Sequence, residues 1–226
     1  MRILIACEYS GIVRDAFTAK GHDAWSCDLL PTESPGNHIQ GDVLEILNDG
    51  WDMMIAFPPC THLANAGGTH FEAKRKNGMQ RGGLEFFATL MNSGIEKIAL
   101  ENPIGILGSR YILKWFPDLV KMGLPRKPDQ VIQPFYFGDH VRKYTCLWLK
   151  GLPKLQWSSD DNLFMKKTAV VPQEPTNTMI RAGKYRTVTV RKIYWQDMLP
   201  KKDRAKNKSK TFPGIAKAMA EQWGNL

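Results

Sequence analysis

The sequence lacks the features of disulfide-rich, zinc-binding and membrane-spanning proteins. Its 226 residues contain only four cysteines, Cys7, Cys27, Cys60 and Cys146, and no Cys-x-x-Cys pair. This scatter argues against a disulfide framework and against a metal site. No apolar run approaches the roughly 18 residues that span a bilayer, and the first residues lack the cleavage region of a signal peptide. We therefore expect a cytoplasmic protein with no metal and no membrane partner.

The composition is that of an ordinary globular protein. Hydrophobic residues make up 43% of the chain and charged residues 23%, which allows one sizeable core and an appendage. Short apolar runs that end in turn residues predict strands, and apolar residues at helical spacing predict helices between them. Strands are expected at 2–7, 24–27, 53–57 and 97–101, and a further pair at 131–138 and 144–149. Helices are expected at 12–20, 82–92, 109–122 and 211–223, the third with an interruption near Pro117.

One strand ends in front of a cysteine. The run Met53–Phe57 is followed by Pro58, Pro59 and Cys60, and the two prolines stiffen the backbone where the strand stops. Open α/β sheets hold their ligands at the carboxyl ends of their strands. Cys60 is therefore a candidate nucleophile, or else a small residue that caps a turn. The other three cysteines lie in apolar runs and are expected in the core.

A second strand ends in an acid. The apolar run from Lys97 reaches Glu101, and Asn102 and Pro103 follow. Two such strand ends can face each other across one edge of a parallel sheet. The segments 57–60 and 101–103 together resemble the Pro-Cys loop and the Glu-Asn-Val strand end of the cytosine-C5 DNA methyltransferases, with proline in place of valine.

This resemblance implies an α/β, Rossmann-like methyltransferase fold. The family has a mixed, mostly parallel sheet with helices on both faces, here with a small basic recognition module. It divides the chain into a catalytic domain at 1–150, a target-recognition region at 151–208, which is the least matched part, and a C-terminal helical segment at 209–226 that returns to the catalytic domain.

The N-terminal third predicts a nucleoside site. A strand, a turn with Gly11, a helix and a second strand that ends at Asp28 follow in the order of a nucleotide-binding βαβ unit, although Gly11 alone can simply start a helix and Asp28 a polar loop. The family resemblance implies S-adenosylmethionine as cofactor. The positions that match its site are Glu8, Ser10, Gly11, Asp28, Asp42 and Phe57, but the family's phenylalanine and second glycine are missing from the turn 7–11.

The resemblance also implies a mechanism. Cys60 adds to C6 of a flipped-out cytosine in double-stranded DNA, and Glu101 protonates or hydrogen-bonds N3 while C5 takes the methyl group. The family's arginine that reaches the cytosine O2 has two candidates here, Arg142 and Lys143, and we favour Arg142 because its fork holds a carbonyl more rigidly.

The net charge of +9 indicates a polyanionic partner. Residues 181–210 contain eleven Lys and Arg against two Asp, which is also +9. A solvated basic tail is the simpler explanation, but Tyr185, Tyr194 and Trp195 lie among the charges, and this mixture suits nucleic acid. The basic stretch 72–81 is either a solvated loop or a phosphate contact. The predicted nucleic-acid contacts are Lys74, Arg75, Arg81, Lys143, Arg181, Lys184, Arg186, Arg191 and Lys192.

Three other functions remain open from the residues alone. An enzyme with the same nucleophile could transfer a different one-carbon group to cytosine, or it could act on RNA. A third alternative is a nucleic-acid-binding relative without catalysis, which the presence of both Cys60 and Glu101 disfavours. The target sequence and the oligomeric state are not determined by these patterns.

Overall fold

The computed structural model describes residues 1–139, 141–157 and 210–226. Over these residues the chain forms a seven-stranded sheet of order β3-β2-β1-β4-β5-β7-β6. The strands are β1 (Arg2–Ala6), β2 (Asp23–Asp28), β3 (His38–Gln40), β4 (Met53–Ala56), β5 (Lys97–Pro103), β6 (Gln130–Ile132) and β7 (Thr145–Lys150).

The sheet is mixed and mostly parallel. Strands β3, β2, β1, β4 and β5 pair in parallel, and β7 is antiparallel to both of its neighbours, β5 and β6. A sheet of this order, with the seventh strand reversed and inserted between the fifth and the sixth, is the Rossmann-like methyltransferase fold. The predicted fold class is therefore confirmed.

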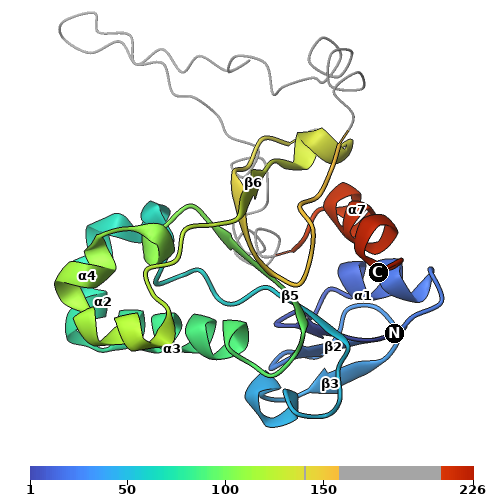
Figure 1. Cartoon of the computed structure of the whole chain (residues 1–226), viewed down its shortest axis with the longest axis horizontal. Helices are drawn as coiled ribbons and strands as arrows, with labels where there is room; N and C mark the ends of the chain where they lie inside the picture. The colour runs from blue at the N-terminus through green and yellow to red at the C-terminus, as the bar shows by residue number, and fades with distance from the viewer. Residues whose placement is uncertain (140, 158–209) are drawn as a thin grey trace, which may run out of the picture.

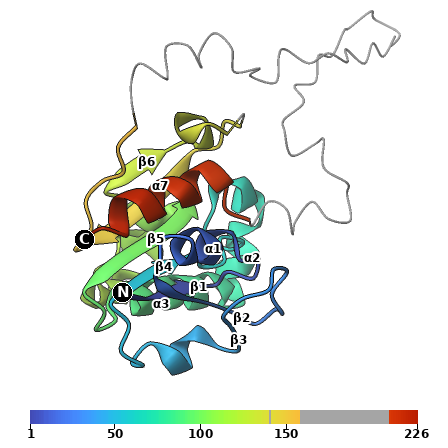
Figure 2. The ribbon, with the colours of Figure 1, turned by 90° about the vertical axis from the view of Figure 1, so that its right-hand side faces the viewer.

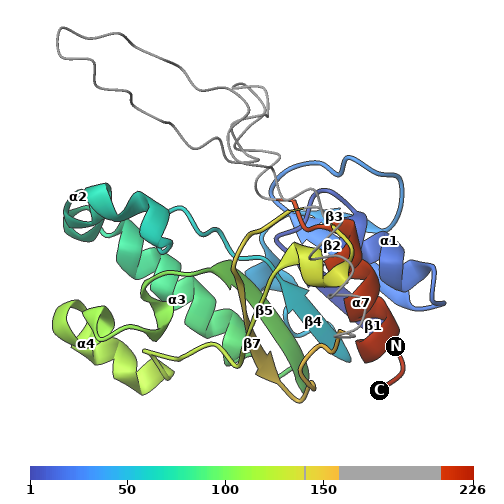
Figure 3. The ribbon, with the colours of Figure 1, turned by 90° about the horizontal axis from the view of Figure 1, so that it is seen from above.

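Helices cover both faces of the sheet (Figures 1 and 3). The α-helices in the described residues are α1 (Ile12–Thr18), α2 (Phe71–Lys76), α3 (Met79–Met91), α4 (Tyr111–Trp115) and α7 (Pro213–Trp223). Short 3-10 helices lie at Val43–Ile46, Asn65–His70, Ile106–Gly108, Pro117–Met122 and Pro134–Phe137. Helices α1 and α7 lie on one face, and α3 lies on the other with α2 and α4 beside it (Figure 3). No helix in this part of the chain is long and apolar enough to cross a membrane.

The two faces follow from the alternation of side chains along each strand. In β1, Leu4 and Ala6 pack toward α3 and α4, whereas Ile3 and Ile5 pack toward α1 and α7. Every residue of β4 is buried, as expected for a central parallel strand that is covered on both sides. Strands β1 and β4 are thus nearly continuous apolar runs, and this is why they could be found in the sequence. The sequence analysis missed β3, a three-residue strand with no fully buried residue.

Several predicted boundaries are wrong, and each difference has a local cause. The first strand ends at Ala6 because Cys7 turns the chain with φ 57°, a left-handed conformation that is rare for a non-glycine residue. The stretch 72–81 is no loop but α2 and the start of α3, separated by Gly78 at φ 79°. The expected strand 131–138 gives way after Ile132 to a 3-10 turn that begins at Pro134.

The C-terminal helix α7 packs against α1 (Figure 2). Its Trp223 is fully buried and donates a hydrogen bond from Nε1 to the Pro153 carbonyl at 2.9 Å. The Gly214 amide donates to Asp139 Oδ2 at 3.0 Å, which ties the start of the helix to the end of the 3-10 turn after β6. Most of the predicted recognition region at 151–208 lies outside the described residues, so the division into three parts stays a prediction.

Candidate active site

The Cys60 loop begins at the carboxyl end of β4, in the middle of the sheet. Phe57 still hydrogen-bonds the adjacent strand, since its amide donates to the Ala6 carbonyl at 3.0 Å. Pro58 and Pro59 then stop the ladder because neither has an amide hydrogen. The Cys60 carbonyl accepts hydrogen bonds from the amides of Leu63 and Ala64 at 3.0 and 2.9 Å. The thiol is thereby presented on a tight turn, and Cys60 is exposed.

Glu101 lies on the next strand, at the same edge of the sheet. Because β4 and β5 run parallel with Ala56 opposite Leu100, the residues that follow each of them are neighbours. The strand does not end at Glu101, as its sequence predicts, but continues to Pro103 because the antiparallel partner β7 pairs as far as Thr145. Glu101 is consequently held on both sides, and its carboxylate accepts a hydrogen bond from the Thr145 side chain.

A buried amide joins the two strand ends. The Asn102 side chain, 1% exposed, donates from Nδ2 to the Pro58 carbonyl at 2.8 Å. The loop is therefore fixed at Pro58, two residues before Cys60, to Asn102, which directly follows Glu101. An exposed proline-rich turn alone would not fix the position of Cys60 relative to Glu101.

The backbones of the two loops also approach each other closely. Ala64 and Gly105 form an antiparallel bridge, and the Ile106 amide donates to the Leu63 carbonyl at 3.0 Å. A Cβ on Gly105 would lie 2.1 Å from the Leu63 carbonyl oxygen, closer than any side chain tolerates. Gly105 is thus a site residue that the sequence analysis missed, and its signal is a glycine just after the strand that carries the acid.

Gly105→Ala is expected to destabilise the protein by about 1–3 kcal/mol, because the added methyl group forces the two backbones apart. Urea denaturation measures the change. Gly94→Ala is the matched control, since a Cβ there meets no atom within 4 Å, and its stability should stay within about 0.5 kcal/mol of wild type. Equal effects of the two variants would contradict the close approach.

Three charged groups surround the thiol. Partial desolvation by the surrounding chain raises the pKa of Cys60 although the residue keeps an exposed surface. The Glu101 carboxylate raises this pKa further, whereas Lys143 and Lys74 act in the opposite direction. Burial also raises the pKa of Glu101, partly offset by Lys143 and by the bond from Thr145. Glu101 and Lys143 line one cleft, and the parallel register of β4 and β5 brings the Cys60 loop to the same edge of the sheet.

The cation beside the acid is Lys143. The Arg142 guanidinium instead lies 5.4 Å from the centre of the Phe135 ring. Lys143 lines a small cleft in front of Glu101, together with Thr145, Lys210, Thr211, Phe212 and Ile215. Residues 210–215 come from the start of the C-terminal segment, so the cleft forms only when this segment packs against the sheet.

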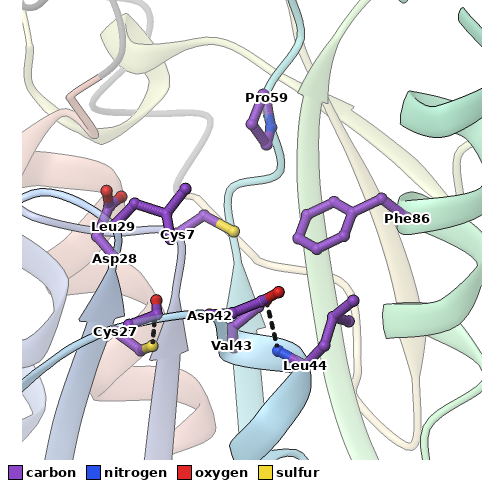
Figure 4. A pocket seen from close by; sticks show the side chains of 10 residues that line it. Cys7, Cys27, Asp28, Leu29, Asp42, Val43, Leu44, Pro59 and Phe86 are labelled. Atoms are coloured by element: carbon purple, nitrogen blue, oxygen red, sulfur yellow. Dashed lines mark hydrogen bonds between the residues drawn. The ribbon is translucent and has the colours of Figure 1, made fainter. Parts of the chain in front are cut away.

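A larger cavity lies at the ends of β1 and β2. It has a volume of about 310 Å³, and its lining residues are Cys7, Cys27, Asp28, Leu29, Gly41, Asp42, Val43, Leu44, Pro59 and Phe86. Figure 4 shows the Cys7 sulfur pointing across the cavity toward Phe86. Because Pro59 directly precedes Cys60, the cavity reaches the nucleophile loop.

Two of the predicted cofactor residues provide the acids of this cavity. Asp28 is the last residue of β2, and its Oδ1 accepts from the Leu30 amide at 2.9 Å. Asp42 precedes the 3-10 helix Val43–Ile46, and its Oδ1 accepts from the Leu44 amide at 3.0 Å. Each carboxylate has a second oxygen that can accept from a ligand hydroxyl or amine. The rest of the lining is mostly apolar, which suits a flat aromatic ring.

The other predicted cofactor residues do not line the cavity. Glu8 is 4% exposed, and its Oε1 accepts from Ser10 Oγ at 2.7 Å and from the Val13 amide at 3.0 Å, so this pair closes the start of α1. Burial raises the pKa of Glu8. Gly11 packs under the buried Arg14 side chain, and Phe57 packs with the core on the α1 and α7 face. The other lining residues were not predicted. Among them, Cys7 lies in a turn and Phe86 in a helix, and neither position gives a local signal.

Two of the predicted nucleic-acid contacts in 72–81 already have partners within the protein. Arg81 is held by Asp118 through two bonds of 2.8 and 2.9 Å and by Glu85 at 3.1 Å, so it acts between α3 and the 3-10 helix Pro117–Met122. Arg75 stacks 3.7 Å from the centre of the Trp115 ring. The remaining predicted contacts, Arg181, Lys184, Arg186, Arg191 and Lys192, lie outside the described residues.

Comparison with known proteins gives a likeness to solved structures. No protein-family model and no curated protein matches the chain. Among solved structures, a candidate DNA modification methyltransferase encoded within an E. coli prophage is similar, with a TM-score of 0.40 and 15% sequence identity. The alignment covers 70% of this chain and 49% of that one, so this chain matches about half of that protein's length. Among the described residues, no three His, Cys, Asp or Glu side chains gather as a metal site requires.

Proposed function

We propose that this protein is a DNA (cytosine-5)-methyltransferase that uses S-adenosylmethionine. One observation carries the proposal: an exposed cysteine and a partly buried acid lie at the carboxyl edge of neighbouring strands, joined by the 2.8 Å bond from Asn102 to Pro58 and flanked by Lys143. The Rossmann-like methyltransferase fold adds a cavity beside them that ends at Pro59.

The charge states of Cys60 and Glu101 support each other. A protonated Glu101 no longer raises the pKa of the neighbouring thiol, so the neutral acid and the thiolate favour each other. These are the forms that the reaction needs. The Cys60 thiolate adds its electron pair to C6 of cytosine, and the Glu101 proton passes to N3 as electron density arrives there.

Addition at C6 turns C5 into a nucleophilic enamine carbon. S-adenosylmethionine, when bound, supplies an electrophilic methyl group for that carbon. A base then removes the C5 proton, the Cys60 sulfur leaves, and N3 returns its proton to Glu101, so that one proton is released for each methyl group gained. Lys143 lies beside the acid and can hold the cytosine O2, which takes the place that the sequence analysis gave to Arg142.

The cavity residues fit the cofactor in part. Asp28 and Asp42 would accept from the ribose hydroxyls and the adenine amine, and Leu29, Leu44 and Phe86 would contact apolar surface. Glu8 and Ser10 would act indirectly, by fixing the turn that leads into α1. Since ring faces are inaccessible in a duplex, the target base must flip out, and Lys74 and Arg75 would contribute charge for the phosphates.

The test of the proposal is incubation with labelled S-adenosylmethionine and duplex DNA, followed by digestion and nucleoside analysis. Label in 5-methylcytosine supports it. Label in RNA only, supplied in a parallel reaction, would indicate the RNA alternative. An absence of transfer with both substrates, although the protein binds DNA, would favour a different donor or the non-catalytic relative.

Asp28→Ala is expected to weaken S-adenosylmethionine binding by about 10-fold to 100-fold, because a bond from a charged acceptor contributes roughly 1.5–3 kcal/mol. Calorimetric titration of the purified protein, alone and with DNA, measures the change. Asp49→Ala is the control, since this exposed acid does not line the cavity. Unchanged binding by Asp28→Ala would place the cofactor elsewhere.

A further inference from the structure

The peptide carbonyls directly after Cys60 are held from outside the loop. Lys74 on α2 donates from Nζ to the Thr61 carbonyl at 2.6 Å. Gln80 on α3 donates from Nε2 to the His62 carbonyl at 3.3 Å. With the bonds of the Cys60 carbonyl inside the turn, three successive carbonyls are fixed. The α2–α3 helix pair thus sets the backbone path of the loop after Cys60, as Asn102 does before it.

The orientation of Gln80 is itself determined by a chain of side-chain bonds. The Tyr111 hydroxyl donates to Gln80 Oε1 at 2.9 Å, and Arg75 Nη1 donates to the Tyr111 oxygen at 2.9 Å. Gln80 is fully buried. Because its Oε1 already has a donor, the amide must turn its Nε2 toward the His62 carbonyl. Arg75 is fixed in turn by its stacking on Trp115.

Lys74 adds a charge to this support. Its Nζ lies where a Cβ on Gly67 would come within 2.8 Å, so the glycine leaves room for the ammonium beside the loop. The same positive charge lowers the pKa of Cys60. Lys76 lies two residues after Lys74 on the same short helix. It pairs instead with Glu72 at 2.8 Å and has no bond to the loop among the described contacts.

We propose that Lys74, Gln80 and Tyr111 are positioning residues for the Cys60 nucleophile: they hold the carbonyls after it, and Lys74 also stabilises its thiolate. The proposal rests on the proposed function, in which Cys60 must meet C6 of the base at a defined angle. A shift of about 1 Å at a reacting group can slow a reaction about 100-fold. Buried hydrogen bonds of the loop are therefore expected to affect rate more than binding.

The first experiment measures alkylation of Cys60 by iodoacetamide in the free protein across pH 6–10, with the modified peptide quantified by mass spectrometry. Lys74→Met is expected to move the profile to higher pH and to slow alkylation at pH 7.5 by about threefold to tenfold. Lys74→Arg should restore the wild-type profile because it keeps the charge. Lys76→Met is the matched control and should leave the profile unchanged.

The second experiment measures covalent capture by duplex DNA that carries 5-fluorocytosine, at saturating DNA and S-adenosylmethionine. Tyr111→Phe, which keeps the ring and removes only the hydroxyl, is expected to slow capture by about 10-fold to 100-fold at unchanged DNA affinity. Tyr136→Phe is its control, since that hydroxyl accepts only from Gln133, at 3.3 Å, among the described contacts.

Two results would overturn the proposal. One is an equal pH profile for Lys74→Met and Lys76→Met. The other is a Tyr111→Phe protein that melts at a lower temperature yet captures DNA at the wild-type rate, since this is the behaviour of a merely structural bond. If wild-type protein captures no DNA, the proposed function fails, and the alkylation profiles still decide whether Lys74 acts on Cys60.

Discussion

A Cys60→Ser variant is expected to transfer no measurable methyl group to DNA. The hydroxyl has a far higher pKa than a thiol and adds poorly to C6, so a loss of about 10⁴-fold or more is expected, as for other removed nucleophiles. Because Cys60 is exposed, the free energy of unfolding of the variant should differ from that of wild type by less than about 0.5 kcal/mol. Binding to duplex DNA should persist, and capture by 5-fluorocytosine DNA should disappear, since fluorine cannot leave C5 as a proton does.

The other cysteines provide the control. Burial raises the pKa of Cys27 and of Cys146 to about 11, and it raises that of Cys7 as well. These thiols therefore stay protonated at neutral pH, and Cys146→Ser, which lies outside the cofactor cavity, should still form the covalent complex. A Cys60→Ser protein with near-normal activity would sink the covalent mechanism.

Glu101→Gln is expected to change two rates in opposite directions. Methyl transfer at saturating DNA should fall by about 10²-fold to 10⁴-fold, the usual contribution of a general acid, because glutamine cannot give N3 a proton. Alkylation of Cys60 by iodoacetamide in the free protein should become faster at neutral pH. The carboxylate raises the pKa of Cys60, so its removal lowers that pKa and increases the thiolate fraction.

This pair of measurements separates catalysis from structure. Glu96→Gln, an exposed acid just before β5, is the control and should change neither rate. A Glu101→Gln variant that loses DNA affinity and turnover equally would indicate a structural role for the acid. Slower alkylation in that variant would contradict the proximity of Glu101 to the thiol.

Most of the sheet was predictable because it is buried on both faces. Its central strands are largely apolar runs bounded by prolines, glycines and acids, and such runs need no tertiary context to be found. The short edge strand β3 is only partly buried and was missed. The errors lie where one residue changes the backbone path. Cys7 leaves the strand with a positive φ, and Gly78 separates α2 from α3 in a stretch that reads as a polar loop.

The position of a candidate site residue follows from the sequence only where the sheet itself places that residue. Cys60 and Glu101 follow or end neighbouring parallel strands, so the topology alone brings them to one edge. Asp28 and Asp42 reach the cavity in the same way. By contrast, Glu8 and Ser10 sit at a strand end and still turn inward, because the first turn of α1 needs their oxygen atoms.

By itself, the sequence determined the α/β class, the central strands and the candidate residues for chemistry, since these depend on residue type and on short-range spacing. The tertiary structure alone decided which of two adjacent cations lies beside the acid, that Arg81 is held by Asp118, and that Gln80 donates to the His62 carbonyl in the Cys60 loop. Each of these depends on contacts between segments far apart in the chain. A shift of one residue turns a side chain away from its partner, and no local pattern records that direction.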